Sequence, residues 1–90
     1  MKTVLVTTEF RGVFFGYLED GSKLPEQCTL RDARNCIYWS LDCRGFLGLA
    51  TIGVTPNCKI GMKVDKLTLY KITSVTDVSK EAEKTWTETP

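Results

Sequence analysis

Apolar residues fall in short groups along most of the 90-residue chain, often alternating with polar ones. Short groups rich in Val, Ile, Leu and aromatic residues, bounded by Gly and Pro, are typical of β-strands. They predict strands at residues 3–8, 13–18, 27–30, 35–39 and 67–72. The polar residues at positions 31–35 predict a turn between the third and fourth strands, and Pro56 and Gly61 indicate an irregular segment at residues 54–61.

The strand predicted at residues 13–18 is apolar on both faces, because its aromatic and aliphatic residues do not alternate with polar ones. One face can pack into the core, whereas the other needs a helix, a ligand or a partner subunit to cover it. Two short helices look too small to cover both faces, so we expect a closed homo-oligomer. Gly16, inside this strand, indicates a β-bulge or a close approach by backbone or ligand.

Two segments carry helical patterns. Apolar and small residues recur at helical spacing between Arg44 and Gly53, with Asp42 as a plausible N-cap and Gly53 as the C-cap. Ser79 is the expected N-cap of a final helix that buries Ala82 and Trp86, and residues 87–90 should fray. The order of elements predicts one α+β domain over residues 1–90, a small bent antiparallel sheet or partly closed β-barrel with two short helices.

Charge and hydropathy narrow the class of partner. With 12 basic and 11 acidic residues the formal net charge is +1, which argues against a protein that coats long nucleic acids. The N-terminal apolar run stops at Thr7 and Thr8, and no segment approaches the roughly 20 apolar residues that span a bilayer. We therefore expect a cytoplasmic protein without a membrane partner.

The residue types favour binding over catalysis. The chain has no histidine, which removes Ser-His-Asp and Cys-His catalysis, and it has neither a phosphate-binding P-loop nor a Cys-x-x-Cys pair. We expect no enzyme activity, no cofactor, no bound metal, and four free thiols at Cys28, Cys36, Cys43 and Cys58. The open alternative is hydrolase chemistry by a carboxylate pair drawn from Glu9, Asp20, Asp32, Asp42 and Asp65.

Arginine beside aromatic residues suits a flat anionic ligand, because the guanidinium group can form bidentate hydrogen bonds with a phosphate while an aromatic ring stacks on a base. The segment 31–40 concentrates these types, and Arg34 is expected to point from the turn toward a phosphate. The predicted ligand-binding residues are Arg34, Asn35, Tyr38, Trp39, Arg11, Phe14, Arg44 and Phe46. The alternative is a core strand whose arginines are solvated or paired with Asp32 or Glu9; the pocket would then lie near Arg11 or the helix start at residues 42–44.

The chain resembles a family of small proteins of tailed bacteriophages and prophages, usually carried as a domain of unknown function. The resemblance covers most of the chain, and its most distinctive motif is Ala33-Arg34-x-x-x-Tyr38-Trp39. Further matches are Val4-x-Val6-x-Thr8, the run from Gly12 to Leu18, the glycine-rich stretch from Gly45 to Gly53, and Leu67-Thr68-Leu69. The resemblance implies a phage origin and supplies no chemistry of its own.

Small phage proteins often counter host defence, and one class sequesters the cyclic nucleotides of immune signalling. By analogy of size, origin and pocket chemistry, the first hypothesis is a non-catalytic homo-oligomer that binds a cyclic nucleotide in the infected bacterial cell. The alternative is a protein-binding inhibitor that docks on a host defence or transcription protein through its aromatic face. A structural or morphogenesis accessory is the third hypothesis.

Overall fold

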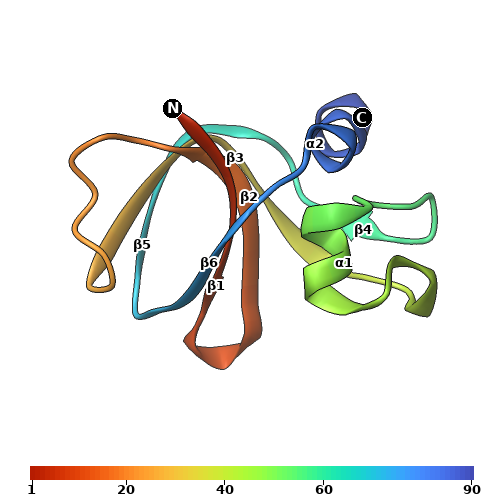
Figure 1. Ribbon diagram of the computed structural model, residues 1–90, viewed down its shortest axis with the longest axis horizontal. Helices are drawn as coiled ribbons and strands as arrows, with labels where there is room; N and C mark the ends of the chain where they lie inside the picture. Colours follow the sequence, from red (N-terminus) through yellow and green to blue (C-terminus); the bar gives the residue numbers. More distant parts are fainter.

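The computed structural model describes residues 1–90 and contains a six-stranded antiparallel sheet and two α-helices (Figure 1). The strands are β1 Lys2–Thr8, β2 Gly12–Leu18, β3 Gln27–Tyr38, β4 Lys59–Ile60, β5 Val64–Tyr70 and β6 Ile72–Asp77. The helices are α1 Gly45–Thr51 and α2 Lys80–Glu88, and the short 3-10 turns are η1 Glu9–Arg11 and η2 Leu41–Cys43. The predicted α+β class is confirmed. Neither helix has the length and apolar character that crossing a membrane requires.

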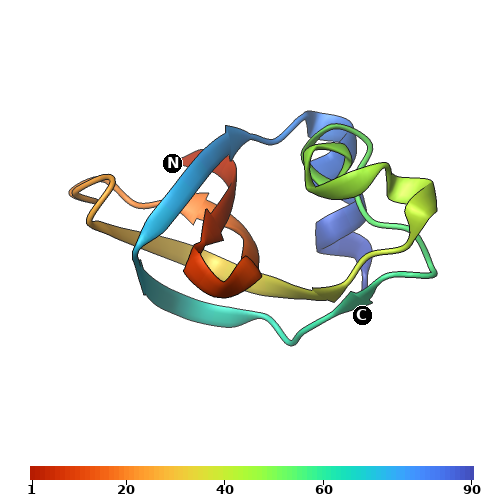
Figure 2. The same cartoon turned by 90° about the horizontal axis from the view of Figure 1, so that it is seen from below.

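The sheet is strongly bent. The strand order is β4-β3-β2-β1-β6. Strand β5 also pairs with β3, along the same edge of β3 as β4 and opposite the edge that pairs with β2. Strands β5 and β6 follow each other through Lys71, whose φ is 57°, yet they pair with opposite edges of the sheet. The sheet therefore curls around without closing, as the view in Figure 2 shows. The predicted bent antiparallel sheet is confirmed.

The curl creates two hydrophobic cores, one on each side of the sheet. The inner core lies within the curl and contains Val4, Val6, Cys28, Leu30, Ala33 and Leu69. The outer core lies between the sheet and the helices and contains Leu5, Val13, Phe15, Cys36, Cys43, Leu49, Ala50 and Trp86. Neighbouring residues of β1 point into different cores, as the period of two in a strand requires.

Both apolar faces of β2 are thus covered by the chain itself. Val13 and Phe15 pack in the outer core, while Phe14 and Leu18 pack against the inner core. This removes the premise that led us to expect a homo-oligomer, namely that the helices alone would have to cover both faces. The oligomeric state stays a prediction, and the mass measured by light scattering at micromolar concentration checks it against the 10.1 kDa of one chain.

The turn predicted at residues 31–35 is wrong, because β3 runs without a break from Gln27 to Tyr38. Polar residues suggested a turn, but the structure holds a β-bulge: Asp32 has a φ of 49°, and the β2–β3 register shifts between Phe15 and Tyr17. The bulge indicated by Gly16 is confirmed; a Cβ there would lie 2.9 Å from the Cβ of Leu30.

The bulge changes which residues of β3 point toward each of the two cores. Leu30 before it and Ala33 after it, three positions apart, both belong to the inner core. One extra residue inverts the alternation of faces. Arg34 and Cys36 consequently point toward the helices, and Arg34 reaches the end of α2.

The remaining elements follow the prediction in part. Ser79 caps α2, since its Oγ accepts from the Ala82 N–H at 3.0 Å, and both Ala82 and Trp86 are buried as predicted. Asp42 does not cap α1, because it lies in η2 and Arg44 occupies the N-cap position. The strand predicted at residues 67–72 breaks at Lys71, and the chain continues into β6, which the sequence analysis missed.

Candidate functional site

Arg34 is one of the two buried polar or charged residues, with an exposed fraction of 6%. Its Nε donates to the carbonyl of Gly61 at 2.8 Å, and its Nη1 donates to those of Trp86 at 3.1 Å and Thr89 at 2.5 Å. Its Nη2 donates to the carbonyl of Pro90 at 3.1 Å. These bonds use four of the five guanidinium N–H groups. Arg34 therefore holds the end of α2 and the residues after it, and neither Asp32 nor Glu9 pairs with it.

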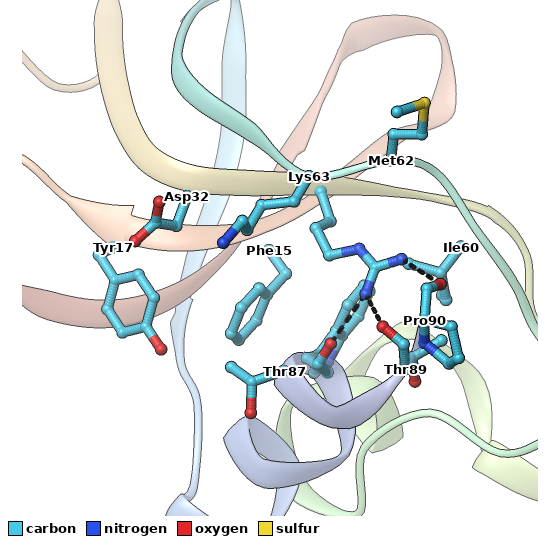
Figure 3. A pocket seen from close by; sticks show the side chains of 11 residues that line it. Phe15, Tyr17, Asp32, Ile60, Met62, Lys63, Thr87, Thr89 and Pro90 are labelled. Carbon is cyan, nitrogen blue, oxygen red and sulfur yellow. Dashed lines mark hydrogen bonds between the residues drawn. The ribbon is translucent and has the colours of Figure 1, made fainter.

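A pocket of about 530 Å³ opens beside Arg34, between the β2–β3 part of the sheet and the end of α2 (Figure 3). Its lining comes from five parts of the chain, namely Phe15 and Tyr17, Asp32 and Arg34, Ile60, Met62 and Lys63, Trp86 and Thr87, and Thr89 and Pro90. Residues far apart in the sequence thus meet here because the bulged β3 lies between β2 and the segment 60–63. We refer to this cavity as the Arg34–Lys63 pocket.

Two side chains of this pocket carry charges that no partner within the protein neutralises. The two ion pairs of the structure are Lys2–Asp77 and Lys71–Glu9, so neither Lys63 nor Asp32 belongs to one. Figure 3 shows the Lys63 ammonium extended over the cavity and Asp32 at the same end, near Tyr17. With Arg34, the lining has two cations and one carboxylate, which favours an anion that also carries a hydrogen-bond donor.

Aromatic side chains also line the pocket; Phe15 and Trp86 are almost completely buried, so Tyr17 supplies the ring surface that a ligand can reach. The rings of Phe15 and Trp86 are stacked, with centroids 4.9 Å apart and planes 5° from parallel. Tyr17 meets Phe15 edge-on at 5.8 Å, and its hydroxyl donates to Oε2 of Glu83 at 2.6 Å. Burial and the Glu83 carboxylate raise the pKa of Tyr17 to about 12, so the phenol stays neutral at physiological pH. Tyr17 is half-buried and can offer ring surface to a ligand.

The predicted ligand-binding residues do not form one site. Arg34 lines the pocket described above, while Arg11, Trp39 and Phe46 line a second hollow of about 660 Å³ next to the β1–β2 hairpin. The other four line neither: Phe14 packs against the inner core, Arg44 is exposed at the start of α1, Asn35 lies against Gly61, and Tyr38 is 53% exposed. The ligand-binding role of all eight stays a prediction.

Two residues that give the pocket its chemistry, Tyr17 and Lys63, were missed as site residues, and Asp32 was considered only for a carboxylate pair or as an ion-pair partner. Tyr17 lies beside the bulge and Asp32 lies in it, and the only sequence signal for the bulge is Gly16, which already indicated a bulge or a close approach. Lys63 lies just after β4, in a stretch without periodicity. Nothing in the local sequence indicates that this stretch reaches the end of α2, so Lys63 could not be found from the sequence alone.

The fold and the site together define a small α+β domain with a charged, ring-lined pocket and no group of three His, Cys, Asp or Glu residues that could hold a metal ion. The chain belongs to the family described as Domain of unknown function (DUF6948), which matches residues 1–86. No curated protein and no solved structure matches the chain.

Proposed function

We propose that the chain is a non-catalytic binding protein that takes a small anionic molecule with a planar ring, such as a cyclic nucleotide, in the Arg34–Lys63 pocket. The observation that carries this proposal is the pairing of two cations, neither bound to an acid, with the half-buried ring of Tyr17. The volume of about 530 Å³ lies within the range of roughly 300–1,000 Å³ that small-molecule sites occupy.

Each part of a nucleotide has a matching group in the pocket. Lys63 has three donors free for a phosphate, and Arg34 has one N–H left beyond its four carbonyl partners. Asp32 can accept from a ribose hydroxyl or a base amino group. Tyr17 is held in place by Glu83 and presents a ring on which a base can stack.

The biological role we propose is sequestration of a cyclic-nucleotide immune signal by a phage protein in the cytoplasm of the infected bacterium. The resemblance to small phage proteins supports the origin. The pocket residues offer groups that bind an anion. The chain has no histidine, so only carboxylates such as Asp32 would be available for general acid–base catalysis, and this supports a binding role. A homo-oligomer remains part of this proposal.

Replacing Lys63 by alanine is expected to weaken binding of the responding cyclic nucleotide by about 10- to 100-fold, the worth of a charge-assisted hydrogen bond. The fold should not change, because Lys63 is exposed and has no partner in the protein. A thermal-shift panel of cyclic dinucleotides, cyclic trinucleotides and cyclic ADP-ribose variants identifies the ligand, and calorimetry then compares the two proteins.

Arg11→Ala is the matched control for Lys63→Ala. It removes an exposed cation of similar length from the second hollow, next to Trp39 and Phe46. Binding should survive this change unaltered. The opposite result, in which Arg11→Ala abolishes binding and Lys63→Ala does not, would move the ligand to the second hollow and refute the assignment to the Arg34–Lys63 pocket.

One observation favours a second candidate function, inhibition of a host protein by docking. Ile37, Tyr38 and Leu41 lie within five residues and are 63%, 53% and 97% exposed, respectively. Exposed apolar groups of this kind often mark a protein interface. A flat response across the whole nucleotide panel would favour this candidate.

A further inference from the structure

Cys43, at the end of η2, and Cys58, directly before β4, both contact Ser40. Cys43 lies in η2 and its Sγ donates to the carbonyl of Ser40 at 3.0 Å. Cys58 lies 15 residues further along, and its Sγ is 4.0 Å from Oγ of the same Ser40. One serine thus contacts both sulfurs, although neither thiol belongs to the Arg34–Lys63 pocket.

The surroundings of the two thiols differ. Cys43 is fully buried, whereas Cys58 is partly exposed and lies 3.6 Å from Oγ1 of Thr55. The hydroxyls of Ser40 and Thr55 also donate to the carboxylate of Asp42, which ties the two loops together. Cys58 is therefore the thiol that a solvent-borne reagent reaches, within a ring of polar groups that hold its position.

The acid–base properties of the thiols agree with this geometry. Burial raises the pKa of Cys58, but hydrogen bonds with Thr55 and Ser40, chiefly with their backbone, outweigh it, so the pKa lies below its usual value. Burial and the neighbouring Cys58 raise the pKa of Cys43, and burial raises that of Cys36 to about 12. The thiolate is the reactive form of cysteine, which singles out Cys58.

We propose that Cys58 is an oxidation-sensitive thiol and that Cys43 is the partner with which it forms a reversible disulfide under hydroperoxide. The assignment rests on the partial exposure of Cys58 and on the contact of both sulfurs with Ser40.

The chemistry proceeds in two steps with hydrogen peroxide as the oxidant. The Cys58 thiolate attacks one peroxide oxygen, so an S–O bond forms, the O–O bond breaks, and hydroxide leaves; the sulfur is oxidised to a sulfenic acid and the peroxide is reduced. The Cys43 sulfur then attacks the Cys58 sulfur, the S–S bond forms, and the S–O bond breaks. The hydroxyl leaves as water by taking the proton of Cys43, and the proton that Cys58 released on becoming a thiolate neutralises the hydroxide of the first step.

Peptide mapping of the full chain after treatment with stoichiometric hydrogen peroxide tests the proposal. We expect a Cys43–Cys58 disulfide that dithiothreitol reverses, and a free Cys28. Cys58→Ser should slow the loss of the first thiol by about tenfold, because burial raises the pKa of the other three thiols and so lowers their thiolate fraction. Cys43→Ser should leave a sulfenic acid on Cys58, which dimedone traps.

Cys28→Ser is the matched control, because Cys28 is fully buried in the inner core and its pKa is raised by burial. It should leave both the rate and the disulfide unchanged. A disulfide between Cys58 and Cys36, or equal oxidation rates in the wild type and in Cys58→Ser, would overturn the proposal. Circular dichroism of each variant separates these outcomes from a loss of fold.

Discussion

Trp86→Ala is expected to lower the free energy of unfolding by about 4 kcal/mol, the largest effect of any single change proposed for this chain. Trp86 is fully buried, and its ring stacks on Phe15 of the sheet. Its Nε1 donates to the carbonyl of Leu49 at 3.1 Å, which joins α2 to α1. Alanine would leave a large cavity in the outer core and a buried carbonyl without a donor. Urea unfolding followed by circular dichroism measures the change.

Two further variants distinguish packing from a general sensitivity to aromatic substitutions. Trp86→Phe keeps a ring against Phe15 but loses the hydrogen bond to Leu49, so it should cost roughly 1–2 kcal/mol. Phe10→Ala removes a ring that is 92% exposed and should change stability by less than about 0.5 kcal/mol. An unfolding free energy for Trp86→Ala equal to that of the wild type would mean that α2 does not hold the outer core together.

The sequence predicted the fold well wherever a single local signal decides the structure. Alternating apolar groups placed β1 and β2, and Ser79 placed the start of α2. The two misplaced regions share one cause, a left-handed residue inside extended chain: Asp32 in β3 and Lys71 between β5 and β6. Few residues other than glycine adopt this conformation, and no local sequence pattern predicts a left-handed Asp or Lys. Asp32 was read as a turn, and Lys71 was read as strand.

The site was predictable only as a type of chemistry. An arginine beside aromatic rings does exist at Arg34, but the rings are those of Phe15, Tyr17 and Trp86 instead of Tyr38 and Trp39. A bulge moves every later side chain of a strand to the other face, so an error of one residue at Asp32 changes the neighbours of Arg34. Tertiary structure, and not the spacing within segment 31–40, selects the residues that meet.

Arg34→Ala is expected to destabilise the protein by about 3 kcal/mol, contrary to what a turn at residues 31–35 would predict. In a solvated turn, loss of an arginine leaves folding largely intact. Here the guanidinium is buried and donates to four carbonyls, three of them at or beyond the last turn of α2. Hydrogen bonds from a charged group contribute about 1.5–3 kcal/mol each, and water can replace only those at the exposed end. Urea unfolding again measures the loss.

The outcome of Arg34→Lys separates the shape of the guanidinium from its charge. Lysine keeps the charge, but its single ammonium group cannot donate hydrogen bonds to the carbonyls of both Gly61 and the end of α2. Arg34→Lys should therefore be more stable than Arg34→Ala and less stable than the wild type. Arg31→Ala is the control, since Arg31 lies on the same strand and has no side-chain partner in the structure; it should have little effect. If Arg34→Ala folds as stably as Arg31→Ala and yet loses nucleotide binding, Arg34 acts on the ligand. If stability falls and the folded fraction retains its affinity, Lys63 alone supplies the cation that the phosphate contacts.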